Sequence, residues 1–188
     1  MIFDASEISD VYTVELEKRS DDRGFFSRGW CGREFSDRGL PNRVAQMNIS
    51  FNRRRHTMRG FHYQIPPYQE DKLLRCVRGA VHDVVLDLRP NSRTFLRHIA
   101  VELSAANYRA LFVPKGCANA FLTLEDDTEI TYLVSEFYTP AAERGVRWND
   151  QTFRINWPAK PAVISDKDRC WPDFIAECTS LLATADQG

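Results

Sequence analysis

Hydrophobic and polar residues alternate through the middle of the chain, a pattern typical of short β-strands. In residues 81–88, the even-numbered positions share one face of a strand and the odd-numbered positions share the other. A turn at residues 90–92 leads into a second alternating segment, residues 95–103, which we expect to pair antiparallel with the first. Further strands are predicted at residues 109–113, 120–124 and 129–134. Because no helical pattern separates them, the spacing predicts an antiparallel sandwich or barrel.

Helical spacing is found mainly near the C-terminus. After Pro172, hydrophobic residues recur at helical spacing: Phe174, Ile175, Cys178, Leu181 and Leu182. We therefore expect a short helix there, lying on the barrel. The chain has no internal repeat and no linker rich in glycine, serine or proline. Residues 1–188 are thus predicted to form one domain.

Composition and charge narrow the class of protein. The chain has 25 Lys+Arg and 26 Asp+Glu, and 43% of its residues are hydrophobic. This balance is typical of a globular domain and argues against a nucleic-acid binder with a global positive field. No window approaches the ~20 apolar residues of a membrane span, and the N-terminus lacks the pattern of a secretory signal, so we expect a cytoplasmic protein. The five cysteines form no C-x-x-C pair and are expected to be reduced thiols.

The densest cluster of reactive side chains lies between Gln46 and Lys72. Within it, His62 has Phe61 and Tyr63 as neighbours and shares the opposite strand face with Gly60 and Gln64. Two interpretations are open: a hydrogen-bonded histidine in the wall of a core, or an imidazole pointing into a polar lumen. In the lumen, an ordinary imidazole pKa near ~6.5 would suit a general base at neutral pH.

The sequence gives little support for a metal site or a cofactor site. The four histidines, at positions 56, 62, 82 and 98, include no His-x-His pair and no glutamate that would complete a two-histidine, one-carboxylate site. Neither phosphate-loop motif occurs, and there is no G-x-S-x-G nucleophile motif. We therefore expect no metal and no cofactor. His82 is an unusual polar residue within its strand and faces either the lumen or the core.

Several motifs resemble, in order and approximate spacing, those of one known family. They are Asp21-Asp22-Arg23-Gly24-Phe25-Phe26, Gln46-Met47-Asn48-Ile49-Ser50, Arg59-Gly60-Phe61-His62-Tyr63-Gln64, residues 72–79, Asp87-Leu88-Arg89, Trp148-Asn149-Asp150 and Ile155-Asn156-Trp157-Pro158. The chain resembles the dTDP-4-dehydrorhamnose 3,5-epimerase family, nucleotide-sugar epimerases of the cupin class. The resemblance implies an all-β, cupin-type antiparallel barrel (jelly roll) over about residues 46–160, with a C-terminal helical tail over about 165–188. It also implies a homodimer in which strands within about residues 1–45 are exchanged and help to complete the partner's nucleotide site.

The resemblance assigns roles to individual residues. It implies that His62 is the base, that Asp168 orients it, and that Tyr132 is the acid. Lys72 would supply positive charge at the oxygen of a ketone whose neighbouring carbon loses a proton. A phenol on the opposite wall suits reprotonation from the other face, which inverts the carbon. Arg23, Gln46, Asn48 and Arg59 match family positions that hold the nucleotide and its diphosphate. We expect the substrate-binding set to include Phe26, Arg28, Asn119 and His82 as well.

Two positions depart from the family pattern. Asn119 stands where a second active-site histidine is usual, and an amide does not titrate near neutrality. Arg28 stands where a base-reading glutamate is usual, which suggests a nucleotide other than dTDP, such as GDP or CDP. The leading hypothesis is an epimerase of a nucleoside-diphosphate 4-keto-6-deoxy sugar, acting at C3, C5 or both, in the synthesis of deoxysugars for polysaccharides. The alternatives are a sugar-nucleotide-binding cupin without turnover and a metal-dependent cupin enzyme.

Overall fold

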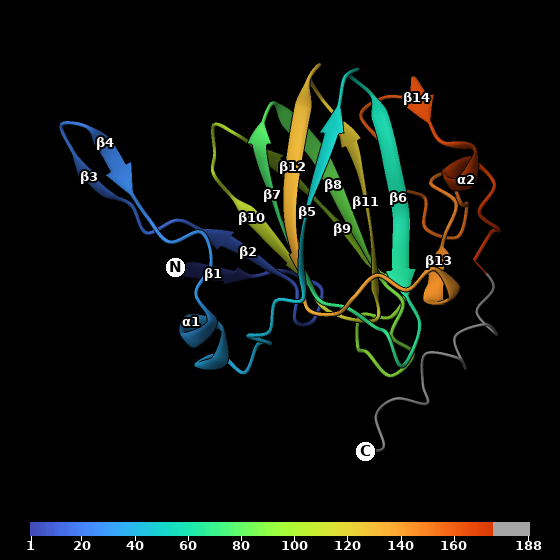
Figure 1. Ribbon diagram of the computed structural model, residues 1–188. Coiled ribbons are helices and arrows are strands. Elements are labelled where there is room, and N and C mark those ends of the chain that lie inside the picture. The colour runs from blue at the N-terminus through green and yellow to red at the C-terminus, as the bar shows by residue number, and fades with distance from the viewer. Residues whose placement is uncertain (175–188) are drawn as a thin grey trace.

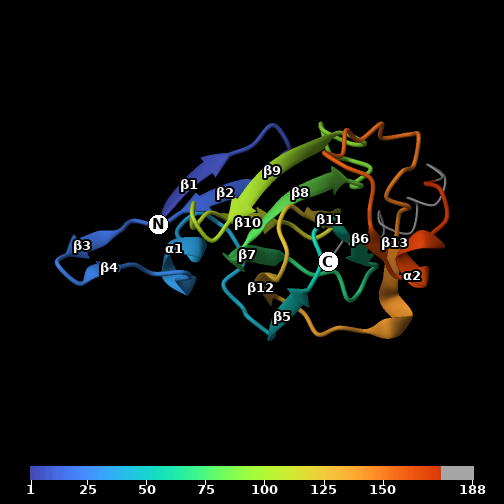
Figure 2. The same cartoon turned by 90° about the horizontal axis from the view of Figure 1, so that it is seen from above.

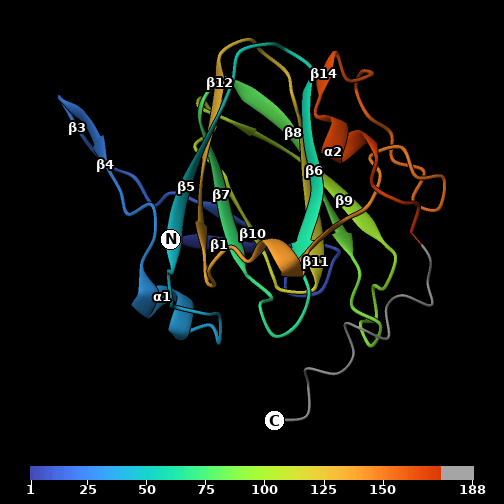
Figure 3. The same cartoon turned by 45° about the vertical axis from the view of Figure 1, so that its right-hand side comes forward.

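The structure is a computed structural model that describes residues 1–174, and it is built almost entirely of antiparallel strands (Figure 1). Two sheets face each other and form the two walls of a barrel (Figure 3). The first sheet contains, in spatial order, β1 (Ile2–Ala5), β2 (Tyr12–Glu15), β10 (Ala110–Val113), β7 (Lys72–Arg78), β12 (Thr128–Val134) and β5 (Gln46–Asn52). The second contains β13 (Glu143–Gly145), β6 (Thr57–Gln64), β11 (Cys117–Thr123), β8 (Ala80–Asp87) and β9 (His98–Ser104). The predicted all-β jelly-roll class is confirmed.

Smaller elements lie around the barrel. A hairpin of β3 (Arg19–Asp21) and β4 (Gly24–Phe26) projects from it, and helix α1 (Gly32–Ser36) follows this hairpin (Figure 1). On the other side of the molecule lie the 3-10 turn η1 (Pro140–Ala142), the strand β14 (Val163–Ile164), which pairs parallel with β6, and helix α2 (Asp166–Arg169). Figure 2 shows α2 beside β6. Helix α2 thus brings the C-terminal region against the second sheet.

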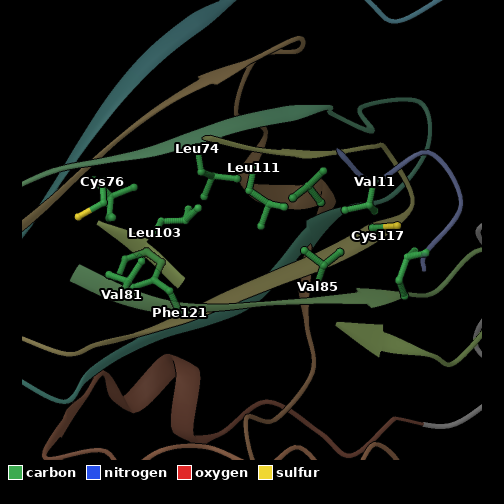
Figure 4. Packing of buried hydrophobic residues seen from close by; sticks show 12 residues of the cluster. Val11, Leu74, Cys76, Val81, Val85, Leu103, Leu111, Cys117 and Phe121 are labelled. Carbon is green, nitrogen blue, oxygen red and sulfur yellow. The ribbon is translucent and has the colours of Figure 1, made fainter. Parts of the chain in front are cut away.

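Three clusters of buried side chains hold these layers together. The cluster between the sheets includes Leu74 and Leu111 from the first sheet and Val81, Val85 and Phe121 from the second (Figure 4). A second cluster packs the C-terminal segment on the outer face of the second sheet, and a third packs α1 on the outer face of the first. The alternation along each strand decides which cluster a residue joins, since successive side chains point to opposite faces.

Most of the strand predictions are confirmed. The predicted segment 81–88 corresponds to β8, and it pairs antiparallel with β9 as expected. However, β9 begins only at His98, because Leu96 adopts a left-handed backbone (φ 64°) and its N–H bonds to the Asp87 carbonyl in a turn. Strands β3 and β4 have three residues each, too few to show a periodic pattern. The helix predicted after Pro172 lies, apart from Phe174, outside the described residues.

Candidate active site

A cavity of about 370 Å³ lies between the two sheets, where β5 and β7 begin and β12 ends. Register explains why its residues meet: Val134 of β12 is paired with Gln46 on one side and with Lys72 on the other. The wall from the second sheet comes from the end of β6 and the start of β13. The lining residues are Gln46, Asn48, His62, Tyr63, Gln64, Glu70, Lys72, Tyr132, Val134, Tyr138 and Glu143. Five of the sequence-predicted site residues are therefore in one cavity.

His62 and Asp168 form a hydrogen-bonded pair at this cavity. The distance from His62 Nε2 to Asp168 Oδ1 is 2.6 Å, and the aspartate side chain is only 6% exposed. Strand alternation sends Phe61 into the outer cluster and leaves the imidazole facing the lumen. A buried carboxylate bonded to one ring nitrogen can hold an imidazole in a fixed orientation and favours its protonated form.

Two local hydrogen bonds hold Asp168 in place. Its backbone N–H donates to Ser165 Oγ, which caps α2, and its Oδ2 accepts the backbone N–H of Gly60 at 3.4 Å. Burial opposes ionisation of Asp168, but the hydrogen bond and charge of His62, with the Gly60 N–H, lower the pKa of the carboxyl below its ordinary value. Asp168 is therefore an anion at neutral pH, as an orienting carboxylate must be.

Gly60 lets β6 approach β11 closely at this point. Its φ of +106° is a conformation that other residues rarely adopt. A Cβ here would lie 2.5 Å from the Asn119 carbonyl oxygen and 2.6 Å from the Ala120 Cα, both of which belong to the backbone. Glycine is therefore required two residues before His62, where the backbone also donates to Asp168.

Lys72 supplies a cation on the opposite wall. Its Nζ donates to the carbonyl oxygen of His62 at 3.3 Å and lies 3.2 Å from Glu70 Oε1. The lysine side chain is 10% exposed and that of Glu70 11%. An ammonium so enclosed interacts strongly with negative charge that develops nearby. Its direct contact with the His62 backbone holds the ammonium beside strand β6.

Tyr132 lines the same cavity from β12, where it is paired with Asn48 of β5. Burial raises the pKa of its phenol, the negative charge of Glu70 raises it further, and Arg59 opposes the shift. The phenol therefore keeps its proton near neutral pH and can donate it.

The structure adds Glu70, Tyr138 and Glu143 to the lining residues anticipated from the sequence. The Tyr138 hydroxyl donates to Glu143 Oε2 at 2.6 Å, and Lys167 forms an ion pair with the same carboxylate. Hydrogen bonds from these two partners lower the pKa of Glu143 against the effect of its burial. Glu70 could have been predicted from the sequence, because it lies two positions before Lys72 and so falls on the same side of an extended chain. Tyr138 and Glu143 could not, because the loop between them carries no periodic pattern.

The other predicted binding residues lie outside this cavity. Arg23 and Phe26 are exposed on the β3–β4 hairpin, and Arg28 follows it. Arg59 donates from Nε to Asn52 Oδ1 at 2.7 Å. Asn119 is buried and donates from its amide to Asp83, a fully buried carboxyl. Burial raises the pKa of Asp83 well above its ordinary range, while the Asn119 hydrogen bond and Lys72 oppose this.

The expectation that His82 faces the lumen and binds substrate is wrong. On β8, Val81 and Val85 belong to the cluster between the sheets, whereas Val84 and Leu86 belong to the outer cluster. His82 is two positions from Val84 and therefore points to the same outer face of the strand. Its ring stands edge-on to the Trp157 ring, with the ring centroids 5.8 Å apart. Burial lowers the pKa of this imidazole. His82 is a packing residue of the outer layer, the alternative that the sequence left open.

A larger hollow of about 660 Å³ lies elsewhere, between the segment that follows α1, the loop after β8 and the loop after β10. None of the sequence-predicted site residues lines it. Within residues 1–174, no group of three or more histidine, cysteine, aspartate or glutamate side chains is placed to hold a metal ion. Across the same part of the chain, no helix has the length and apolar character needed to cross a membrane.

The chemistry of the cavity and the architecture around it define a class of protein. Inversion of a carbon centre needs one group to remove a proton and another to return it from the opposite face. An imidazole, His62, and a phenol, Tyr132, line this cavity together with the ammonium of Lys72. The fold and site are thus those of an isomerase built on a cupin barrel.

Comparison with known proteins identifies the family. A family profile for dTDP-4-dehydrorhamnose 3,5-epimerase matches residues 5–176, and the chain belongs to this family. It is 41% identical over 165 residues to the dTDP-4-dehydrorhamnose 3,5-epimerase of Escherichia coli (strain K12), which covers 87% of this chain and 89% of that protein.

Solved structures agree in fold. The dTDP-4-dehydrorhamnose 3,5-epimerase of Bacillus anthracis, with TDP and PPi bound, has a TM-score of 0.88 and 36% identity, covering 92% of this chain and 99% of that one. ChmJ, a 3'-monoepimerase from Streptomyces bikiniensis in complex with dTDP-quinovose, has a TM-score of 0.85 and 36% identity over 94% of this chain and 90% of its own. The similar proteins thus include a double epimerase and a C3 monoepimerase by name.

Proposed function

We propose that this protein epimerises a dTDP-4-keto-6-deoxy sugar at a carbon beside the ketone, C3, C5 or both. The observation that carries the proposal is the shared cavity: His62, held by Asp168 at 2.6 Å, faces the same space as Lys72 and Tyr132. The names of the relatives support dTDP as the nucleotide and do not favour the GDP or CDP alternative suggested by Arg28.

The reaction begins with removal of a proton from carbon. Neutral His62 takes the proton beside the C4 ketone, and the electron pair of the C–H bond moves to the ketone oxygen as an enolate. Lys72 stabilises the negative oxygen, and Asp168 stabilises the imidazolium. Such stabilisation at both ends lowers the barrier because both charges appear only as the bond breaks.

Inversion is completed by Tyr132. Its phenol donates a proton to the same carbon from the opposite face, the enolate returns to the ketone, and solvent exchange restores the protonation of both residues. The raised pKa of Tyr132 keeps this proton in place until the enolate forms. The alternative without turnover is less well supported, because the base, its orienting carboxylate, the cation and the acid are all present around one cavity.

We further propose a homodimer in which the β3–β4 hairpin of one protomer completes the nucleotide site of the other. Strands β1 and β2 extend this chain's own first sheet, so the part of segment 1–45 that projects is the hairpin (Figure 1). Phe26 on it is 69% exposed, and Arg23 is exposed nearby. On the outer face of β5, Met47 and Ile49 are 62% and 67% exposed. Such an apolar strand face is suited to a second copy.

A cytoplasmic location fits this function. The four described cysteines, Cys31, Cys76, Cys117 and Cys170, are free thiols, as expected for a reducing compartment.

Isotope exchange tests the reaction. In deuterium oxide, the enzyme should add one deuterium to a dTDP-4-keto-6-deoxyglucose substrate if it acts at one carbon and two if it acts at both, as read by mass spectrometry. His62→Ala should abolish exchange, whereas His98→Ala, on the edge strand β9, should retain it. Absence of exchange in the wild-type protein, with dTDP, GDP and CDP substrates alike, would refute the proposed reaction.

Mixing two inactive variants tests the dimer. A hairpin variant, Phe26→Ser with Arg23→Ser, keeps its own His62, and His62→Ala keeps a normal hairpin. If the hairpin serves the partner's cavity, half of the re-formed dimers will be mixed and each will hold one intact site, which restores about one-quarter of wild-type activity. No restoration, with light scattering confirming mixed dimers, would show that the hairpin does not act in the partner.

A further inference from the structure

Trp171 contacts the catalytic pair from the side of α2. Its indole Nε1 donates to Asp168 Oδ1 at 3.3 Å, the same oxygen that is bonded to His62 Nε2. The indole ring also stands edge-on to the imidazole, with centroids 6.4 Å apart and planes at 69°. One carboxylate oxygen therefore has both rings as partners, and the two rings contact each other.

The indole ring occupies a space that the backbone leaves open for it. A Cβ on Gly145 would overlap the Trp171 ring at Cε2 and Nε1. Gly145 lies on β13, directly paired with His62 of β6. The absence of a side chain at this position thus lets the indole lie against the strand next to the base.

Lys167 holds the indole from another side. Its Nζ lies 5.7 Å from the ring centroid of Trp171 and forms an ion pair with Glu143, which lines the cavity. A cation at this distance from the face of an indole is attracted to it. Trp171 is therefore restrained by a hydrogen bond, by a close backbone approach and by a cation, which distinguishes it from a freely rotating surface residue.

We propose that Trp171 is a positioning residue of the epimerisation, whose indole N–H fixes Asp168 toward His62 and shares the carboxylate's charge. This inference rests on the proposed function of the cavity. A donor to Asp168 reduces the negative charge that faces the imidazole. Without it, the imidazolium would be held more tightly, and His62 would release its proton only at higher pH.

Other charged and titratable groups also face the pair, and a test has to leave them in place. Glu143 acts on His62 from β13, and Lys167 acts on Asp168 from α2. Lys72 contacts the His62 carbonyl from β7, with Glu70 as its partner, and Tyr132 faces the cavity from β12. Replacement of Trp171 by phenylalanine removes one neutral donor, keeps a ring against Gly145 and changes none of these charges.

The test compares Trp171→Phe with wild type and with a matched variant, Trp157→Phe. Trp157 also donates from Nε1, but to the carbonyl of Trp148 at 2.9 Å, away from Asp168. Two quantities are measured: the pH dependence of deuterium exchange into the dTDP-4-keto sugar, and the titration midpoint of the His62 imidazole by NMR in the absence of substrate. Thermal unfolding of each variant reports its stability.

In Trp171→Phe, the acidic limb of the pH–rate profile and the His62 titration midpoint should both move to higher pH by about 0.5 unit, which corresponds to one ordinary hydrogen bond. Trp157→Phe should change neither pH quantity, whatever it does to thermal stability. Unchanged pH quantities in Trp171→Phe would overturn the inference. Absence of exchange in the wild type would instead refute the proposed function, and the NMR midpoint would still decide the role of Trp171.

Discussion

Replacement of Asp168 by asparagine isolates the contribution of its charge to proton transfer. The side chain is 6% exposed, and its Oδ1 lies 2.6 Å from His62 Nε2. Asparagine has nearly the same shape and retains one oxygen acceptor, so the variant keeps the space filled. What it loses is the negative charge that stabilises the imidazolium formed when His62 accepts the substrate proton.

The size of the effect follows from this contact. A hydrogen bond to a charged partner contributes about 1.5–3 kcal/mol, against about 0.5–1.5 kcal/mol for a neutral one. The short distance and burial place the Asp168 bond in the charged class. Because asparagine still forms a neutral hydrogen bond, the transition state loses the difference, about 1–1.5 kcal/mol, which lowers kcat about 5- to 15-fold. Because Asp168 does not line the cavity, KM should change less than twofold or so.

Steady-state turnover of the dTDP-4-keto sugar, followed together with deuterium incorporation, measures both constants. Asp166→Asn is the matched control, since it removes the same charge from the same short helix. The Asp166 side chain is 96% exposed, and its nearest cation, Arg169, is 3.8 Å away. This control should retain wild-type kcat and KM, because an exposed carboxylate with a loose partner contributes little.

Two results would refute the reasoning. A kcat for Asp168→Asn within twofold of the wild-type value would mean that His62 does not depend on this carboxylate. A raised KM with unchanged kcat would mean that Asp168 acts in substrate binding instead, since uniform binding affects KM alone.

Three further predictions follow from the geometry. Tyr132→Phe should still exchange deuterium at the carbon, because His62 remains, but should lose net inversion at least ~100-fold, as chiral analysis of the product would show. Gly60→Ala should lower the free energy of unfolding by at least ~2 kcal/mol in urea, because its Cβ would lie 2.5 Å from the Asn119 carbonyl oxygen; equal stability would contradict the close approach. Burial opposes ionisation of Asp87, but hydrogen bonds from Arg89, Ser92 and Thr94 outweigh it and lower the pKa of this carboxyl in the folded state. Ionised Asp87 therefore stabilises the fold above its unfolded-state pKa near ~3.9. This stabilisation is lost as the pH falls through the lower pKa of the folded state. Urea midpoints measured from pH 6 to pH 3 should therefore fall, and Asp87→Asn should flatten the slope.

The periodic pattern of the chain predicted the consecutive strands β8 to β12 of the barrel. Alternation over residues 81–88 predicted a strand with two distinct faces, and that strand is β8. The same rule placed His62 opposite Phe61, which is how the imidazole reaches the cavity. These inferences worked because the side-chain period of a strand is a local property of the backbone.

The alternation of residues along a strand gives it two faces but does not say which face points into the lumen. His82 and Asp83 are adjacent on β8, and the pattern left His82 able to face either way. Packing decided it: the C-terminal segment supplies Trp157 and Phe153 to the outer face of the second sheet, so His82 joins that layer and Asp83 is buried inside.

The residues of the site lie far apart in the chain, and only the tertiary structure brings them together. His62 and Asp168 are separated by 106 positions, and the resemblance to a family, not any local pattern, linked them beforehand. Glu143, Tyr138 and Trp171 reach the same site from loops and short elements that have no periodicity to read. The sequence by itself determined the strands and the faces of their side chains, because those depend on neighbouring residues. The pairing of the two sheets and the docking of α2 determined which polar groups share a cavity, because such contacts depend on the long-range packing of the whole barrel.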